Sequence, residues 1–150
     1  MDNNDLIHYE YLDPEFVTDG DAMDVAILAK QLRGEDTYTS AYFLSKSASR
    51  CFFLTARANG VRGNIIGMAR LKIDHTPWDV DASIEDVVVH RAFRRRGIAR
   101  SLMEKLIKEA RKNHVTTIQL TSRNHRVEAH KLYENLGFEC RETNVFELAL

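Results

Sequence analysis

The chain has 150 residues, which is the size of one domain and enough to bury a hydrophobic core. Apolar residues make up 44% of the chain, which excludes a mostly disordered protein. Its 21 basic and 22 acidic residues give a formal net charge of −1, which argues against a general nucleic-acid-binding protein with a large basic excess. We therefore expect a single globular domain over residues 1–150.

The first residues and the cysteines indicate a cytoplasmic protein that does not bind membranes. The opening MDNNDLIHYEYLD is acidic and polar, unlike a signal peptide. No apolar run approaches the roughly 18 to 20 residues that are needed to cross a bilayer. Cys51 and Cys140 belong to no CxxC motif, so we expect two reduced thiols.

Apolar spacing and turn residues predict an alternation of strands and helices. In chain order we expect a strand at 6–12, helices at 22–32 and 39–48, strands at 51–56, 65–73 and 84–89, a helix at 98–112, a strand at 116–121, a helix at 127–136, and closing strands at 138–141 and 144–150. Residues 75–81 form a loop. Hairpin turns, such as the one at Asn59-Gly60, imply an α/β fold whose sheet is mixed and mostly antiparallel.

The helix over 98–112 has the clearest pattern, because Ile98, Leu102, Leu106 and Ala110 recur every four residues. Gly137 is expected to end the later helix as a C-cap.

Two further helical details are expected. Arg33-Gly34 is a stop signal for the first helix. In the second helix, Tyr42, Phe43 and Ala48 are expected to turn inward.

The most informative stretch is IEDVVVHRAFRRRGIARSL, residues 84–102, which predicts a strand, an arginine-rich turn and a helix. The valines of IEDVVV favour an extended strand. Gly97 allows the backbone to approach a ligand closely, and the amides of the new helix point outward with the positive end of its dipole behind them. Five arginines lie within ten residues, namely Arg91, Arg94, Arg95, Arg96 and Arg100. The pattern is that of an anion site suited to a ligand with several phosphates.

The motif Arg94-x-x-Gly97-x-Ala99 resembles the pyrophosphate loop of the GCN5-related N-acetyltransferase (GNAT) family. That loop has the pattern Gln/Arg-x-x-Gly-x-Gly/Ala and lies between a strand and a long helix. A Walker loop or a dinucleotide fingerprint needs more glycines than this stretch contains. In NHRVEAHKLYENLGF, residues 124–138, the Asn, the small residue, the Tyr and the Gly-Phe pair resemble the later motif of the family.

The resemblance covers about residues 51–141, and the hairpin NIIGMARLKI looks like the central strands of the family. IEDVVV and the ending TSRNHR…ETNVF are similar to bacterial family members whose acceptor is often unassigned. The resemblance implies a single GNAT-like domain with helices flanking the sheet and a splayed strand pair that holds CoA. It also implies acetyl-CoA as cosubstrate.

The resemblance also implies where CoA binds. Backbone amides of the loop would hold the pyrophosphate, and the main chain of Val87 and Val89 would pair with the pantetheine arm like an added strand. An N–H near Val87 or Val88 would bind the thioester oxygen. Two alternatives stay open: Arg94 holds the loop, and Asn124 caps the following helix. The expected CoA-binding residues are Val87, Val88, Val89, Arg94, Arg95, Arg96, Gly97, Ile98, Ala99, Arg100 and Asn124.

Two residues are candidates for proton transfer. The family match makes Tyr133 the general acid for the leaving thiolate, and the alternative is a packed tyrosine with a locally bonded hydroxyl. Glu85 is the candidate base, directly or through a water, and the alternative is a structural hydrogen bond. Strand alternation predicts that Glu85 points with Val87 and Val89, and that Asp86 points to the other face. The histidines lack ligand spacing, so no metal is expected.

The leading hypothesis is transfer of an acetyl group from acetyl-CoA to a primary amine by direct attack in a ternary complex. The alternative is a catalytically weak CoA-binding regulatory module. The acceptor would be a small-molecule or peptide amine, and neither nucleic acid nor membrane is expected as a partner; the protein would be a monomer or a homodimer. We expect the acceptor pocket between the first two helices, the 75–81 loop and the C-terminal hairpin.

Overall fold

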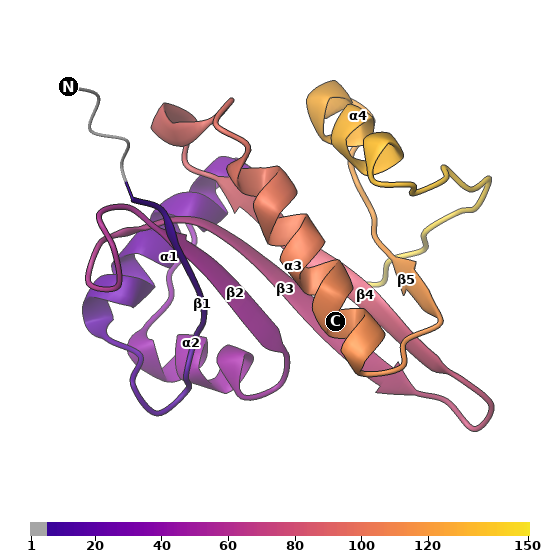
Figure 1. The fold of residues 1–150 in the computed structure, drawn as a ribbon, viewed down its shortest axis with the longest axis horizontal. Helices are drawn as coiled ribbons and strands as arrows, with labels where there is room; N and C mark the ends of the chain where they lie inside the picture. The colour runs from indigo at the N-terminus through magenta and orange to yellow at the C-terminus, as the bar shows by residue number, and fades with distance from the viewer. Residues whose placement is uncertain (1–5) are drawn as a thin grey trace. The chain divides into compact units, whose positions relative to one another are not determined.

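The computed structural model describes residues 6–150. The chain forms two compact units, one ending at Leu120 and the other spanning Thr121–Leu150. The first unit is built on a five-stranded sheet in the order β1-β2-β3-β4-β5 (Figure 1). Its strands are β1 (His8–Tyr11), β2 (Phe52–Arg57), β3 (Ile65–His75), β4 (Val80–Val89) and β5 (Thr117–Gln119). Only β4 and β5 are parallel, so the predicted mixed, mostly antiparallel α/β fold is confirmed.

Three α-helices belong to the first unit and one to the second. They are α1 (Asp19–Arg33), α2 (Ala41–Ala48), α3 (Ile98–Lys112) and, in the second unit, α4 (Val127–Asn135). A short 3₁₀ helix, η1 (Arg91–Phe93), follows β4. Helix α1 begins with a capping box between Thr18 and Asp21 and ends at Gly34, whose φ of 82° is the left-handed conformation predicted for a glycine stop.

The two faces of the sheet are covered by different helices. A Cβ atom built on Gly67 would meet the side chains of Ile98 and Leu102 at 3.3 and 3.4 Å, so α3 packs directly on that face of β3. The next residue, Met68, points to the other face and joins a buried cluster with Val25 of α1 and Leu44 of α2. The sheet therefore separates a layer made of α3 from a layer made of α1 and α2.

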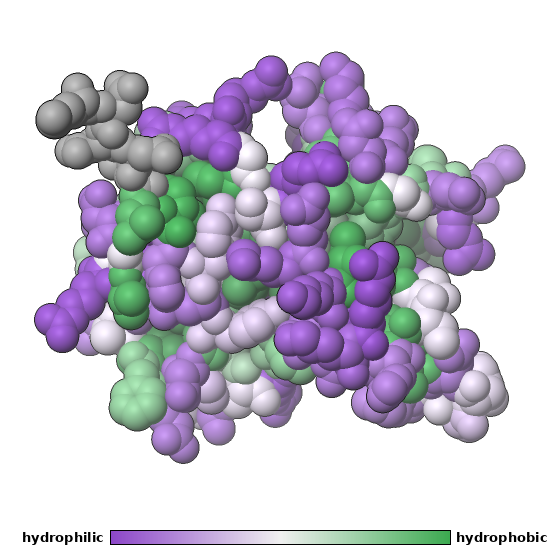
Figure 2. All heavy atoms as spheres, in the orientation of Figure 1, coloured by the Kyte–Doolittle hydropathy of each residue, from purple (hydrophilic) through white to green (hydrophobic). Residues whose placement is uncertain are grey.

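Helix α3 is amphipathic in the way its four-residue repeat predicts. Its buried residues are Ile98, Leu102, Met103, Leu106 and Ala110. Charged residues occupy its outer side, and Figure 2 shows hydrophilic side chains along its course. Burial of this stripe fixes the N-terminus of α3 directly after the arginine-rich turn.

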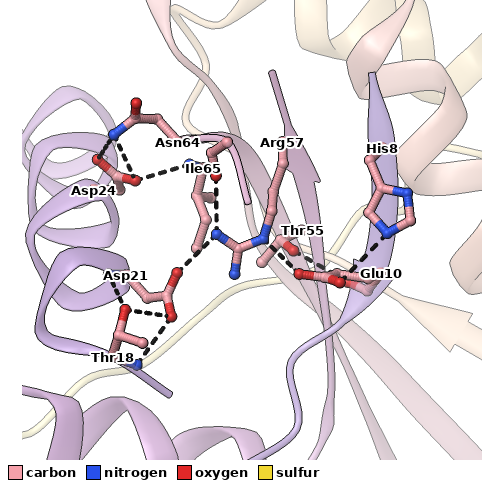
Figure 3. A network of polar contacts seen from close by, with 10 residues as sticks. His8, Glu10, Thr18, Asp21, Asp24, Thr55, Arg57, Asn64 and Ile65 are labelled. Carbon is pink, nitrogen blue, oxygen red and sulfur yellow. Dashed lines mark hydrogen bonds and ion pairs between the residues drawn. The ribbon is translucent and has the colours of Figure 1, made fainter. Parts of the chain in front are cut away.

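A buried ionic network ties α1 and β1 to the hairpin between β2 and β3 (Figure 3). Arg57 is 8% exposed, and its guanidinium contacts Glu10 and lies 2.8 Å from Asp21 Oδ1. It also donates to the carbonyl of Gly63 at 3.1 Å. Burial by itself would raise the pKa of Asp21, but hydrogen bonds from Thr18 and Arg57 outweigh it, so this pKa lies below its ordinary value of 3.8.

Nearby, a second carboxylate on α1 reaches the same hairpin. Asp24 accepts from the backbone N–H of Ile65 at 2.8 Å and from the side-chain amide of Asn64 at 3.1 Å. Helix α1 is thus fastened to the sheet at two points in its first half (Figure 3).

Some local predictions are wrong. Tyr42 and Phe43 are 64% and 60% exposed, whereas Leu44 and Ala48 form the inward face of α2. The expected loop at 75–81 is shorter, because β3 runs to His75 and β4 starts at Val80.

The closing strands are also absent from the described second unit. Residues 138–150 form neither helix nor strand, and Phe146 and Leu148 are 93% and 82% exposed. Alternating apolar residues can mark a strand only where a partner satisfies the backbone and a core covers one face.

Candidate active site

Strand β4 carries a bulge in its second half. Met68 pairs with Val88 and Arg70 pairs with Glu85, so Ala69 alone faces two residues of β4. One of those two, Asp86, has a φ of 53°, a left-handed conformation that aspartate adopts more readily than most residues. The bulge therefore interrupts the alternation of side chains along the strand.

The bulge places two carboxylates on one arginine. Arg70 Nε donates to Asp86 Oδ2 at 2.7 Å, and Arg70 Nη2 lies 3.0 Å from Glu85 Oε2. The prediction that Glu85 and Asp86 point to opposite faces is wrong, because a bulge adds one residue and resets the alternation. For the same reason Glu85 does not point with Val87 and Val89 as predicted: its register partner Arg70 shares a face of β3 with Met68, the partner of Val88. The same guanidinium reaches Ser47 of α2, with Nη1 3.1 Å from the hydroxyl oxygen.

The Glu85 carboxylate has two further donors. Lys72 Nζ lies 3.3 Å from Glu85 Oε1, and the Ser83 hydroxyl lies 3.2 Å from the same oxygen. Together with Arg70, these groups hold the carboxylate in one orientation. The structural hydrogen bonds weighed as the alternative for Glu85 are thus present.

The outer edge of β4 is open where the bulge lies. Strand β5 pairs with β4 only from Asp81 to Ser83, and no other strand of the described residues pairs with β4 on that side. The amide of His90 donates to Ile66 O at 2.7 Å, so the backbone groups of His90 and Val88 face β3. Those of Val87 and Val89 point to the open edge, because backbone groups alternate along a strand. An extended ligand arm would find its hydrogen-bonding partners there.

The turn after β4 presents backbone amides to solvent. Arg95 and Gly97 both have a positive φ, 66° and 75°, and Gly97 is the N-cap of α3 without a side-chain hydrogen bond. The first intrahelical acceptor is Gly97 O, which bonds the amide of Ser101. The amides from Ile98 to Arg100 therefore have no intrahelical partner and lie at the positive end of the helix dipole. A pyrophosphate fits this donor set.

The arginine side chains of the turn are largely engaged by the protein itself. Arg94 Nε donates to Val89 O at 3.3 Å, which agrees with the alternative that Arg94 holds the loop. The guanidinium of Arg96 lies 5.1 Å from the ring centre of Phe93, and Arg100 Nε lies 2.9 Å from Glu104 Oε1. Backbone amides are thus the more available donors of this turn.

A cavity of about 230 Å³ opens on the α1 and α2 side of the sheet. It is lined by both helices, by residues 37–39 between them, and by Phe53, Met68, Arg70 and Asp86 of the sheet. The cavity therefore has the first two helices in its lining, as expected for the acceptor pocket. Residues 75–81 do not line the cavity, and residues 138–150 form no hairpin.

Sequence reasoning missed the residues that organise this cavity, above all Arg70 and Asp86. A signal was present for Arg70, because a charged residue in the middle of the apolar run IIGMARLKI needs a partner when the strand is half-buried. Gln31 of α1 was also missed. Its side-chain oxygen accepts from the backbone N–H of Arg91 at 3.0 Å and ties α1 to the start of the turn.

In the second unit, Tyr133 lies on α4 and is half-buried. Its ring packs edge-to-face against Phe138, with centroids 6.1 Å apart, and among the described residues its hydroxyl has no hydrogen-bond partner. Burial raises the pKa of the Tyr133 phenol above its ordinary value of 10, and the charge of Arg126 opposes the rise. The phenol therefore carries its proton at neutral pH, as a general acid must.

Asn124, also in the second unit, is exposed and precedes α4. The N-cap of α4 is Arg126, without a side-chain hydrogen bond, so the alternative that Asn124 caps the helix is wrong. The helix ends at Asn135 with Leu136 as its C-cap, so the expected glycine, Gly137, comes one residue after the cap. Gly137 has the left-handed φ of 91° of a glycine stop, and the N–H of Phe138 donates to Tyr133 O.

Within residues 6–150, no group of three or more His, Cys, Asp or Glu side chains is arranged to hold a metal ion. None of the helices described for this range has the length and apolar character required to cross a membrane.

Known proteins resemble the chain in sequence and in fold. A histone acetyltransferase of Glycine max is 36% identical over 88 residues, which are 56% of this chain and 36% of that protein. The chain spans about a third of the length of the curated relatives it matches. An acetyltransferase of Trypanosoma brucei superposes with a TM-score of 0.77 at 23% identity, covering 96% of this chain and 99% of that one.

An aminoglycoside N-acetyltransferase in complex with CoA superposes with a TM-score of 0.75 at 18% identity, covering 99% of this chain and 98% of that one. At these identities the two superpositions show a shared fold. The model of the acetyltransferase (GNAT) family matches residues 9–138. This match covers most of the chain, and the chain belongs to the GNAT family.

Proposed function

We propose that the protein transfers an acetyl group from acetyl-CoA to a primary amine by direct attack in a ternary complex in the cytoplasm. The observation that carries this proposal is the continuity of two binding features. The open edge of β4 at Val87 and Val89 leads directly into the turn whose amides precede α3. The strand edge suits an extended amide-bearing arm, and the turn suits a pyrophosphate. CoA joins these two groups in one molecule.

The backbone holds the ligand in this proposal. Amides of the turn from Arg95 to Arg100 bind the pyrophosphate. The outward N–H and C=O of Val87 and the N–H of Val89 bind the pantetheine arm, because the Val89 carbonyl already accepts from Arg94 and Gln31. The backbone N–H of Val87 is favoured over that of Val88 as donor to the carbonyl oxygen, because Val88 faces β3. Such a fixed donor is worth most where negative charge develops during the reaction.

Two side chains carry the protons. When bound, acetyl-CoA supplies a thioester whose carbonyl carbon accepts the amine nitrogen as the carbon–sulfur bond breaks. Glu85 receives the amine proton through a water. Arg70, Lys72 and Ser83 occupy three of the roughly four acceptor sites of its carboxylate, which leaves a place for one water on Oε2. Tyr133 gives its phenolic proton to the departing thiolate, and its raised pKa keeps that proton in place beforehand.

Release of free thiol from acetyl-CoA over a panel of primary amines tests the proposal, with calorimetry measuring CoA binding in parallel. Thiol release that depends on an amine, with mass-spectrometric detection of the acetylated amine, supports it. Binding of CoA without turnover on any amine would favour a CoA-binding regulatory module instead. Absence of binding at millimolar acetyl-CoA would remove both readings.

A further inference from the structure

The cavity between α1, α2 and the sheet has an uneven distribution of charge. Most of its lining is apolar or aromatic, including Val25, Phe43, Phe53 and Met68. Its charged lining groups are Arg33, Arg70 and Asp86. The cavity thus offers one carboxylate and two guanidinium groups.

From this lining we propose that the cavity takes a primary amine carried on an apolar or aromatic body, that Asp86 binds its ammonium group, and that polycationic amines are rejected. The inference rests on the proposed function and names the acceptor class of that same site.

Asp86 is suited to this role by its place on the bulge. Its Oδ2 accepts from Arg70 Nε, whereas Oδ1 has no hydrogen-bond partner among the described residues. Arg70 is itself held by Glu85 and Ser47, so the free oxygen is fixed in direction. A charge-assisted bond from an ammonium group to such an oxygen is stronger than a bond between neutral groups.

The same lining disfavours a second positive charge. A diamine or an aminoglycoside would bring further ammonium groups, and Asp86 is the only carboxylate among the described lining residues. These groups would face Arg70 and also Arg33, whose Nε lies 3.7 Å from Glu35 Oε1 at the exposed rim. A charged group that leaves water without a partner is strongly unfavourable. Tyr38 and Phe43, which line the cavity and are 84% and 60% exposed, offer in contrast aromatic surface to an apolar body.

Calorimetric titration of 2-phenylethylamine and spermidine into the CoA-loaded protein, and into the free protein, tests the inference. We expect tighter binding of 2-phenylethylamine, and a loss of about 10- to 100-fold in its affinity for Asp86→Asn, as when one charged hydrogen bond is removed. Asparagine tolerates the positive φ at this position, so the variant should keep the fold. Asp74→Asn, at an exposed position on β3, is the matched control.

Arg33→Glu gives an independent test, since this side chain is 60% exposed and its replacement should leave the core intact. We expect it to raise the affinity for spermidine several-fold, whereas Arg111→Glu, at an exposed position on α3, should not. Equal or tighter binding of spermidine by the parent protein, or an unchanged affinity in Asp86→Asn, would overturn the inference. Neither result bears on CoA binding or thiol release, so the proposed function is judged separately.

Discussion

Arg70 donates to the Asp86 carboxylate at 2.7 Å and thereby holds the residue at which β4 bulges. The two residues sit on adjacent strands, but they are not register partners, because Arg70 pairs with Glu85. One guanidinium therefore bridges two successive carboxylates that regular alternation would have separated. The contact between Arg70 and Asp86 therefore makes the orientation of the Asp86 carboxylate in the cavity depend on the bulge in β4.

Arg70→Lys should weaken this arrangement while keeping a positive charge. A lysine ammonium lacks the planar fork that bridges two carboxylates, so Asp86 and Glu85 should lose their fixed orientation. We expect kcat/KM for the best amine to fall about tenfold or more, with CoA affinity unchanged. Arg62→Lys, at an exposed position between β2 and β3, is the control. Equal kinetics in the two variants would show that Arg70 has no positioning role.

The parts of the fold that follow from local periodicity could be predicted from the sequence. The four-residue repeat of Ile98, Leu102, Leu106 and Ala110 indicated α3, and glycines marked the ends of α1 and α4. These signals are local, because side-chain spacing and left-handed caps act within a few residues. The turn before α3 was predictable for the same reason.

The features that depend on pairing between distant segments could not be predicted. The bulge at Asp86 has no glycine to announce it, and it appears only when β3 and β4 are in register. The partners of Arg57 lie on β1 and α1, far from it in sequence. Residues 144–150 show the converse case. A strand was expected there, but Phe146 and Leu148 are exposed and no strand of the described residues pairs with this segment.

Asp21→Asn should destabilise the protein by about 3 kcal/mol, because it leaves the buried Arg57 with one carboxylate fewer. The pKa of Asp21 is lowered in the folded protein, so its contribution is present above pH 3.8 and is lost as the pH falls through the folded value. The difference in unfolding free energy between parent and variant should therefore shrink below about pH 4. Urea denaturation at several pH values measures it.

The control for Asp21 is Asp19→Asn, which removes a negative charge from the same first helical turn at an exposed position. Its effect should be limited to the interaction with the helix dipole, about 0.3–1 kcal/mol. If Asp21→Asn costs no more than this control, the ion pair with Arg57 contributes little to stability.

Gly97→Trp should block CoA without unfolding the protein. No atom lies within 4 Å of a Cβ built on Gly97, so the new side chain has open space, and its bulk should compete with a pyrophosphate bound at this turn. The positive φ of 75° adds a backbone cost of about 1–2 kcal/mol. Gly60→Trp bears a similar backbone cost at a φ of 89° and also has no atom within 4 Å.

Comparison of these two tryptophan variants separates the effect of backbone strain at a positive φ from the effect of blocking the CoA site. Both should lower the melting temperature of the free protein, whereas only Gly97→Trp should lose the rise in melting temperature that acetyl-CoA gives. A ligand that binds only the folded state at 100 times its Kd adds about 2.7 kcal/mol, which a thermal scan detects readily. Equal stabilisation of both variants by acetyl-CoA would place the pyrophosphate elsewhere.

Tyr133→Phe should keep CoA affinity and slow the chemical step by roughly 10²–10⁴, the usual range for a positioned general acid. The ring remains in place against Phe138, so packing should change little. Tyr11→Phe is the control, because Tyr11 also has a raised pKa, about 12, chiefly from burial and also from Glu109, although its side chain is 40% exposed. It lies on β1, and we expect it to leave the reaction unchanged.

The Tyr133 comparison requires single-turnover measurement with the best amine, since slow product release would hide a loss in the chemical step under steady-state conditions. The loss should appear in the rate of acetyl transfer and not as weaker binding of either substrate. Because the raised pKa keeps the phenol protonated at neutral pH, the rate of the parent should not depend on its ionisation there. An unchanged single-turnover rate in Tyr133→Phe would make Tyr133 a packing residue, and the proton for the thiolate would then come from solvent.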